Sequence, residues 1–315
     1  MSRPSDKDAA MSVPSDSHLD PWPALSYPDF AGTQYLLHMG LQAVGKLKLK
    51  APFQPQWSAI VIAMSARGLT TGPIDHVGGA YEINIDLISH ELIGVTSWGR
   101  VERFKLASMS VAEFVQRLFD LLQKLGVDVS INLMPQEVAN PIAFDQDKER
   151  RPYEPALAHD WWRIMLSTQR VMQVFRGAFE GKTQPIGLMW GTLDIRDVMY
   201  NGKPVAPPPK SDYIRRNAMN AELIEMGWWA GSAAYPKPAF YSFTYPQPAG
   251  IEDAHISPAS ARWDSAMGEF ILDYDDLRQS KDPDGDLLSF FRTAYNAGAE
   301  RAGWDSKLMG SGKPV

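Results

Sequence analysis

The stretch from residue 81 to residue 106 constrains the fold most, because it predicts three short strands in close succession. Apolar and polar residues alternate from Tyr81 to Leu87, which is the period-two pattern of a half-buried strand. Residues 92–96 and 101–106 form further apolar-rich runs, and only a few turn-forming residues separate the three segments. Connections this short join antiparallel neighbours, whereas parallel strands need a long crossover. The stretch therefore predicts an antiparallel meander.

A helix is expected directly after this meander. Ser110 and Glu113 have the spacing of a capping box, and apolar residues recur at helical intervals over residues 114–125. Gly126 supplies a C-terminal stop. The alternation over residues 127–133 then predicts one more strand.

Three elements are expected ahead of the meander. Residues 30–40 have the apolar spacing of a short helix. Leucines alternate with lysines over residues 46–50, which predicts a strand whose lysines face water. Residues 59–64 are continuously apolar and predict a central strand. The first half of the chain is thus expected to form a mainly antiparallel sheet with helices on one face.

The second half mixes helices and strands in the same way. Pro155 suits the first turn of a long helix that ends at Gly181. The remaining pattern predicts strands over residues 186–195, 239–245 and 269–273, and helices over residues 212–226 and from residue 283 onward. Trp228 and Trp229 are expected in a turn that follows the helix over residues 212–226.

The chain is therefore predicted to have an α+β fold of two packed halves. The stretch over residues 135–155 is rich in proline and charge, so it is the best candidate for a linker. With a boundary near Lys148, the predicted parts are a disordered tail over residues 1–20, halves over 21–147 and 148–307, and a flexible tail over 308–315.

Composition excludes several classes of function. The chain has 315 residues and no cysteine, which excludes disulfides, thiolate catalysis and cysteine-ligated metals. A net charge of −6 argues against binding to nucleic acid or to an anionic membrane. No apolar run is long enough for a membrane helix, and the N-terminus lacks the apolar region of a secretory signal. We expect a soluble, cytoplasmic protein.

Motifs for cofactors and metals are missing from the sequence. None of the six histidines has another at the helical spacing of a metal-binding pair, and no glycine-rich dinucleotide fingerprint is present. We therefore predict no cofactor and no metal. The assembly state is left open.

The main candidate site combines aromatic and acidic residues of the second half. Trp190 and Asp194 are expected four residues apart on one face of one strand. The full set is Trp190, Asp194, Glu222, Trp229, Tyr241 and Glu269. Aromatic rings and carboxylates suit a sugar, amine or nucleobase ligand, and two carboxylates can act as acid and base. The alternative is that the aromatics are core residues and the acids are solvated.

Two further residues are candidates on their own. Arg67 lies in a glycine- and threonine-rich loop that could bind an anion through backbone N–H groups and the guanidinium. His159 lies in the first turn of the predicted long helix and could act as a general acid–base group. The alternatives are an ordinary turn and a structural surface histidine.

Six motifs in a fixed order carry a resemblance to a known family. They are Arg67-Gly-Leu-Thr-Thr71, residues 81–86, Trp190-Gly-Thr-Leu-Asp194, residues 239–246, residues 268–270 and the Asp282-Pro helix start. Together they resemble a bacterial family known only as a domain of unknown function, over residues 22–304. The resemblance implies a soluble, full-length bacterial module and no particular activity.

One position departs from the pattern of that family. Relatives tend to show Ser-His-Glu where this chain has Asn220, Ala221 and Glu222. If the histidine of those relatives is catalytic, this protein has lost it.

Two functions follow as alternatives. The first is a protein that binds a small polar ligand in the aromatic and acidic site of the second half, with any catalysis left open. The second is a structural or self-associating interaction protein without catalytic activity. Convergence of the candidate residues on one cavity would favour the first, and an exposed apolar patch would favour the second.

Overall fold

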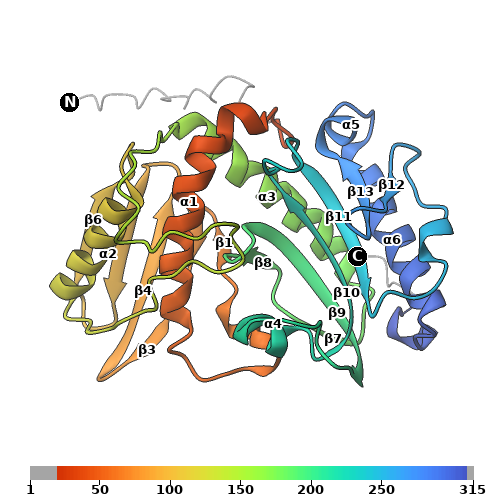
Figure 1. The fold of residues 1–315 in the computed structure, drawn as a ribbon, viewed down its shortest axis with the longest axis horizontal. Coiled ribbons are helices and arrows are strands. Elements are labelled where there is room, and N and C mark those ends of the chain that lie inside the picture. Colours follow the sequence, from red (N-terminus) through yellow and green to blue (C-terminus); the bar gives the residue numbers. More distant parts are fainter. Residues whose placement is uncertain (1–19, 311–315) are drawn as a thin grey trace, which may run out of the picture.

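A computed structural model of the protein describes residues 20–310. Two antiparallel sheets stand side by side, and helix α1 (Tyr27–Lys48) runs between them on one side of the molecule (Figure 1). The predicted α+β class, with antiparallel sheets in both halves, is confirmed. The predicted tails fall mostly on residues 1–19 and 311–315, which lie outside the described residues.

The first sheet contains the predicted meander. Its strands are β1 (Ala63–Ser65), β2 (Gly68–Thr70), β3 (Ile74–His76), β4 (Gly79–Asp86), β5 (Glu91–Thr96) and β6 (Val101–Lys105). They follow the order β1-β2-β4-β5-β6, and β3 pairs with β4. Helix α2 (Val111–Leu125) packs against this sheet, and the Ser110 hydroxyl accepts the N–H of Glu113 at 3.1 Å, as the capping pattern predicts. A short 3-10 helix, η2 (Pro55–Ile60), precedes the sheet.

The second sheet has one face on the core and one face open. Its strands are β7 (Lys182–Thr183), β8 (Gly187–Met189), β9 (Asp194–Pro204), β10 (Ala221–Trp229), β11 (Ala239–Tyr245), β12 (Arg262–Asp264) and β13 (Glu269–Asp273). They follow the order β12-β13-β11-β10-β9-β7, and β8 pairs with β9. Helices α3 (Pro155–Arg176) and α6 (Pro283–Arg301) cover the core face. Helix α4 (Tyr213–Ala218) lies on the opposite face.

Three short helical segments complete the described part of the fold. Helix α5 (Tyr274–Arg278) follows β13 directly, and 3-10 turns occupy Ile251–Asp253 (η3) and Ser306–Leu308 (η4). Backbone hydrogen bonds join residues 308 and 310 to the segment at Ala178 and Glu180.

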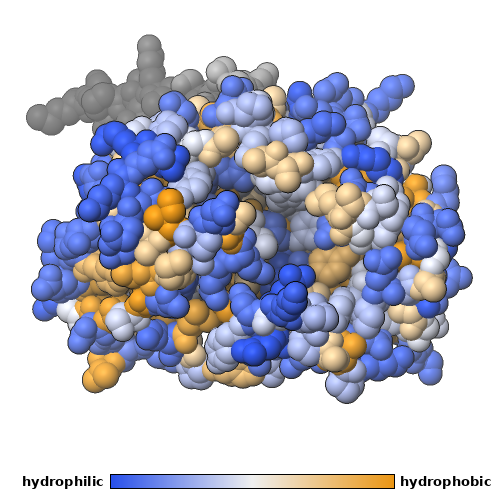
Figure 2. Space-filling view, viewed as in Figure 1, coloured by the Kyte–Doolittle hydropathy of each residue, from blue (hydrophilic) through white to orange (hydrophobic). Residues whose placement is uncertain are grey.

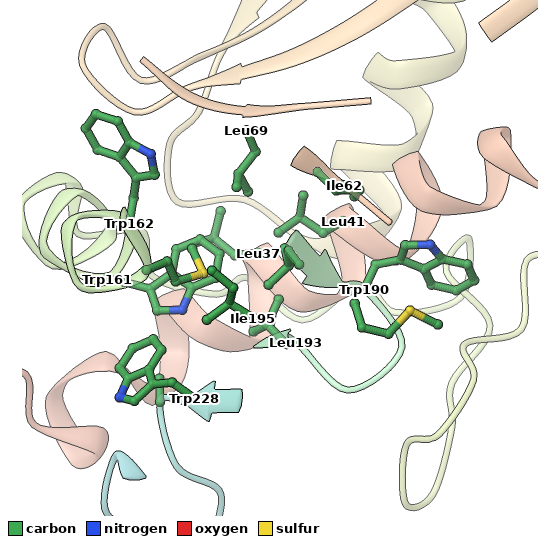
Figure 3. Packing of buried hydrophobic residues seen from close by; sticks show 14 of the residues in the cluster. Leu37, Leu41, Ile62, Leu69, Trp161, Trp162, Trp190, Leu193, Ile195 and Trp228 are labelled. Carbon is green, nitrogen blue, oxygen red and sulfur yellow. The ribbon is translucent and has the colours of Figure 1, made fainter. Parts of the chain in front are cut away.

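One hydrophobic core joins the two sheets. Leu69 of β2, Leu41 of α1 and Ile195 of β9 belong to the same buried cluster, together with Trp161 and Trp228 (Figure 3). A β-bridge between Ile62 and Leu188 adds a backbone connection between the halves. The division into two domains near residue 148 stays a prediction.

Two elements of the first half differ from the sequence prediction. The predicted strand over residues 46–50 is wrong, because α1 continues to Lys48. Lys46 is buried, and its ammonium group donates to the carbonyls of Asn132 and Met134. Leu47 is buried in the core one turn beyond Val44. It therefore continues the apolar face of α1, although the local alternation of leucine and lysine resembles that of a strand. The strand predicted over residues 127–133 is also wrong, since that segment is irregular: the Asn132 carbonyl accepts from Lys46 and the Leu133 carbonyl accepts from the N–H of Phe144.

Two elements of the second half also differ. The helix predicted over residues 212–226 ends at Ala218, and β10 begins at Ala221. Both faces of β10 are buried, so its apolar residues do not alternate with polar ones and the period-two pattern is hidden. Trp228 and Trp229 consequently lie in this strand and not in a turn. The strand predicted over 186–195 is interrupted by a turn at residues 190–193, where Leu193 has a φ of 60°.

Candidate functional site

A cavity of about 610 Å³ opens on the exposed face of the second sheet. Strands β9, β10, β11 and β13 form its floor, and α4 with the loops around Glu137, Pro208 and Gln247 forms its walls. Figure 2 shows the surface hollowed near the centre of this view, between α4 and the strands. A volume of this size suits a small-molecule ligand.

Strand register brings the polar side chains of the cavity onto one face. Asp194 lies opposite Trp229, and Arg196 lies opposite Gly227, across β9 and β10. Gly227 lies opposite Tyr241, across β10 and β11. Because side chains alternate between the two faces of a sheet, all of these residues point to the same side.

Gly227 leaves room for Tyr241 to lie across the neighbouring strand. A Cβ at position 227 would come within 2.5 Å of the Tyr241 ring and hydroxyl. Without that Cβ, the phenol of β11 passes over β10 and its hydroxyl donates to Asp194 on β9. The glycine thus connects side chains of three strands.

The hydrogen bonds on the cavity floor form one buried network. The Tyr241 hydroxyl donates to Asp194 and lies 3.0 Å from Oε1 of Glu225. Asp194 also accepts from the Thr192 hydroxyl. Arg196 donates from Nη1 to Glu225 at 3.3 Å and from Nη2 to Gln184 Oε1 at 3.1 Å. Its Nε is buried without a hydrogen-bond partner among the described residues.

Burial dominates the electrostatics of these groups. Loss of solvation raises the pKa of the Glu225 carboxyl, while the nearby Arg196 charge opposes the shift and Asp194 adds to it. Glu269 is half-buried, and burial together with the negative charges of Glu225 and Asp194 raises its pKa to about 8. Burial and the same two carboxylates raise the pKa of Tyr241 well above its usual value. Burial likewise raises the pKa of Glu137 on the cavity wall, so the site shifts several of its carboxyl groups toward their neutral forms.

Aromatic rings line the cavity beside this network. The rings of Tyr241 and Phe243 are stacked, with centroids 6.3 Å apart and an interplanar angle of 13°. Trp229 meets Tyr241 edge-on at 5.8 Å. Tyr245 completes the row along β11. These side chains present both apolar faces and polar edges to a ligand.

The structure brings four of the six residues of the main predicted set to this cavity. Asp194, Trp229, Tyr241 and Glu269 line it. Trp190 and Glu222 do not. Trp190 is fully buried in the core, where its Nε1 donates to the carbonyl of Ile60 at 3.1 Å.

The other predicted residues lie elsewhere. Glu222 accepts a hydrogen bond from Asn201 near the start of β10. Arg67 pairs with Asp86 at 2.6 Å on the first sheet. His159 lies on α3, with its ring centroid 5.5 Å from that of Trp162.

Several cavity residues were missed by the sequence prediction. Glu225 and Arg196 are the most important, because they complete the buried network around Tyr241. Arg196 lies two residues beyond Asp194 on the same face of β9 and could have been found from that spacing, whereas β10 gives no period-two signal for Glu225. The remaining polar residues of the lining that were missed are Glu137, Thr192, Arg215, Thr244 and Gln247.

Helix α1 of the first half holds two walls of the cavity in place. The side chain of Gln42 accepts the backbone N–H of Gln136 and donates to its carbonyl, both at 2.8 Å. This pairing fixes the loop that carries Glu137. His38 Nε2 lies 2.8 Å from the carbonyl of Gly191, in the turn that leads into Asp194. The cavity thus depends on both halves of the chain.

Two further features bear on function. Within residues 20–310, no three histidine, aspartate or glutamate side chains are arranged to hold a metal ion. No helix in the same range has the length and apolar content to cross a membrane.

Comparison with known proteins gives one match. The model of a family described as a family of unknown function (DUF5996) matches residues 22–311, which include both sheets and every residue that lines the cavity. No curated protein matches the chain, and no solved structure matches it.

Proposed function

We propose a ligand-binding function for this chain, which belongs to the family of unknown function DUF5996. The ligand is a small polar molecule, and its site is the cavity on the open face of the second sheet. The supporting observation is the buried network of Asp194, Glu225, Arg196 and Tyr241 at the floor of that cavity.

Burying such a polar network lowers the stability of the fold, so its presence is best explained by a function. Desolvating a carboxylate costs several kcal/mol, in round terms, and a well-packed apolar cluster would often stabilise a fold better. Here the polar groups face a cavity with room for a ligand, and aromatic rings stand beside them. Polar groups that converge in a concave, partly apolar site are typical of ligand binding.

Sugar-, amine- and nucleobase-like ligands share the chemistry that this site offers. Sugars and nucleobases have a face that stacks on an aromatic ring, an amine has a cation that such a ring attracts, and all three donate hydrogen bonds to carboxylates. The proposal uses Asp194, Trp229, Tyr241 and Glu269 from the predicted set and adds Glu225 and Arg196. Arg67, His159, Trp190 and Glu222 have no part in it. A bacterial, cytoplasmic setting stays a prediction.

A thermal-shift screen over sugars, amines and nucleobases tests the proposal, because a ligand that binds the folded state raises Tm. Trp229→Ala removes one wall of the cavity. Trp98→Ala is the matched control, since Trp98 lies in the turn between β5 and β6 of the first sheet and is 38% exposed. We expect a compound that raises Tm for wild type and for Trp98→Ala, with a much smaller rise for Trp229→Ala. The proposal is wrong if every stabilising compound acts equally on both variants.

The alternative function, self-association, has one observation in its favour. Val77 is 94% exposed at the tip of the β3–β4 hairpin, and its neighbour His76 contacts the ring of Trp98 at 6.0 Å. One exposed side chain is less than the contiguous apolar patch that marks an interface, so self-association stays the second candidate. Light scattering tests it: a stable oligomer that Val77→Ser converts to a monomer supports self-association, and a concentration-independent monomer contradicts it.

A further inference from the structure

The Tyr241 hydroxyl has one hydrogen and two carboxyl neighbours. It donates to Asp194, and its oxygen also lies 3.0 Å from Oε1 of Glu225. A phenol can donate only one hydrogen bond. If both acids were ionised, Glu225 Oε1 would face a lone pair of the phenol oxygen in a buried site, which is unfavourable.

A second proton resolves this arrangement. Asp194 accepts from both Thr192 and Tyr241, and two donors stabilise an ionised carboxylate. Glu225 also pairs with Arg196, but burial is the larger influence and raises the pKa of its carboxyl. We therefore place the proton on Glu225, whose Oε1 then donates to the Tyr241 oxygen. The resulting chain runs from Glu225 through Tyr241 to Asp194, and each donor in it has one acceptor.

Charged groups surround this chain on every side of the cavity. Glu269 of β13 lines the same cavity as Glu225, and the charges of Glu225 and of Asp264 on β12 act on it. Arg196 pairs with Glu225 from β9. Glu137 on the loop after α2 and Arg215 on α4 line the upper walls.

The lining has an excess of acids. It contains four carboxyl groups and two guanidinium groups. Of the two cations, Arg196 is already engaged by Glu225 and Gln184. With Glu225 and Glu269 protonated, the floor is close to neutral. With both ionised, three carboxylates of the floor face one guanidinium group, and negative charge is in excess.

We propose that the cavity binds an organic cation, an amine, amidine or guanidine with a flat apolar body, in exchange for a proton of Glu225 or Glu269. The N–H groups of the cation donate to the carboxylate that forms, and the released proton passes to water. The flat body stacks against Trp229, Tyr241 and Phe243, whose faces attract cations. A neutral sugar of equal size would leave the acids protonated. This inference rests on the proposed function.

Benzamidine and benzamide are suitable probes, because they have nearly the same shape and differ in charge. Benzamidine stays cationic across the pH range of interest, so any pH dependence comes from the protein. Calorimetric titrations in two buffers of different ionisation enthalpy measure both affinity and proton release. We expect benzamidine to bind wild type at least about tenfold more tightly than benzamide, and to release about one proton near pH 7.

Three variants locate the exchange. Glu225→Gln and Glu269→Gln have no proton to exchange at the substituted position, so proton release and the preference for benzamidine should fall in at least one of them. Glu222→Gln is the matched control, because Glu222 belongs to the same strand but not to the cavity. Its proton release should equal that of wild type. The comparison of the two probes on wild type tests the inference even if a variant does not fold.

The outcomes separate this inference from the proposed function. Equal binding of the two probes, or tighter binding of benzamidine without proton release, overturns the cation-for-proton exchange and leaves ligand binding in place. If benzamidine does not bind but a neutral compound binds in a Trp229-dependent manner, the cation-for-proton exchange is likewise overturned and ligand binding stays in place. If no compound of any charge depends on Trp229, the proposed function itself fails.

Discussion

Gly227 and Tyr241 are opposite each other on neighbouring strands, and the glycine lies under the tyrosine ring. A Cβ at position 227 would come within 2.5 Å of the ring. This contact places the Tyr241 hydroxyl between an acid of β9 and an acid of β10. Most properties of the cavity depend on that placement.

Gly227→Ala should disrupt the site. The new methyl group must displace Tyr241, and overpacking in a filled region costs about 1–3 kcal/mol. Urea unfolding should show that loss, and any ligand found by the screen should bind at least about tenfold more weakly. Gly177→Ala is the control: its φ is −55° and a Cβ there makes only ordinary contacts at 3.5 Å. Similar stability of the two variants would contradict the close approach.

Tyr241→Phe should destabilise the protein without changing its shape. The substitution leaves Asp194 without one of its two side-chain donors in a buried site, which costs about 1–3 kcal/mol. Denaturant unfolding at pH 7 measures the loss. Tyr213→Phe is a matched control, since Tyr213 is 60% exposed, and its effect should stay within about 0.5 kcal/mol. Equal stability of Tyr241→Phe and wild type would show that the hydroxyl is not part of a buried network.

Stability should depend on pH through Glu269. Burial raises its pKa to about 8 in the folded protein, from an ordinary value of 4.5. The folded state therefore binds this proton more tightly than the unfolded state does. The resulting stability is fully present below pH 4.5 and is lost as pH rises toward 8. Between pH 5 and pH 9, the free energy of unfolding of wild type should fall relative to that of Glu269→Gln by about 1 kcal/mol or more.

Urea titrations at pH 5, 7 and 9 measure this difference. Glu222→Gln provides the comparison at a glutamate outside the cavity. A difference between wild type and Glu269→Gln that does not change with pH would mean that Glu269 has an ordinary pKa.

Gln42→Leu should loosen one wall of the cavity. Gln42 is fully buried, and its amide satisfies the backbone N–H and carbonyl of Gln136. Leucine fills similar space but leaves both groups unpaired, at a cost of about 1–3 kcal/mol each. Hydrogen exchange should be faster at the Gln136 amide than in wild type. Gln116→Ala, on the exposed face of α2, should leave that exchange rate unchanged; a change in both variants would rule out a local role for Gln42.

Local sequence patterns correctly predicted the elements that have one buried face and one solvent-exposed face. In the meander over residues 81–106 apolar and polar residues alternate, and in α2 apolar residues recur at helical spacing, so the period of each element is visible in the sequence. Strand β10 is buried on both faces, so apolar residues occupy successive positions and no alternation with polar residues is visible. The strand prediction for the leucine–lysine run at the end of α1 was wrong for a related reason: Lys46 is buried, so the lysines of the run do not all face water.

The prediction of a helix where β10 forms also decided which glutamate was assigned to the candidate site. Residues three apart share a face in a helix but take opposite faces in a strand. A helical prediction made Glu222 a plausible partner of the aromatic set. In the strand, Glu225 faces the cavity with Trp229, and Glu222 bonds to Asn201. The sequence indicated the composition of the site, and the tertiary pairing of β9, β10 and β11 decided its members.

The two faces of β10 impose a rule on how this site can evolve. Glu225, Gly227 and Trp229 face the cavity, and the residues between them are buried against the core. Inserting or deleting a single residue would exchange the two sets, placing a carboxylate in the core and a tryptophan in the cavity. Lineages that acquire new ligands can therefore change the identity of these side chains but must preserve their number. The spacing from position 225 to 229 should be constant even where every residue in it varies.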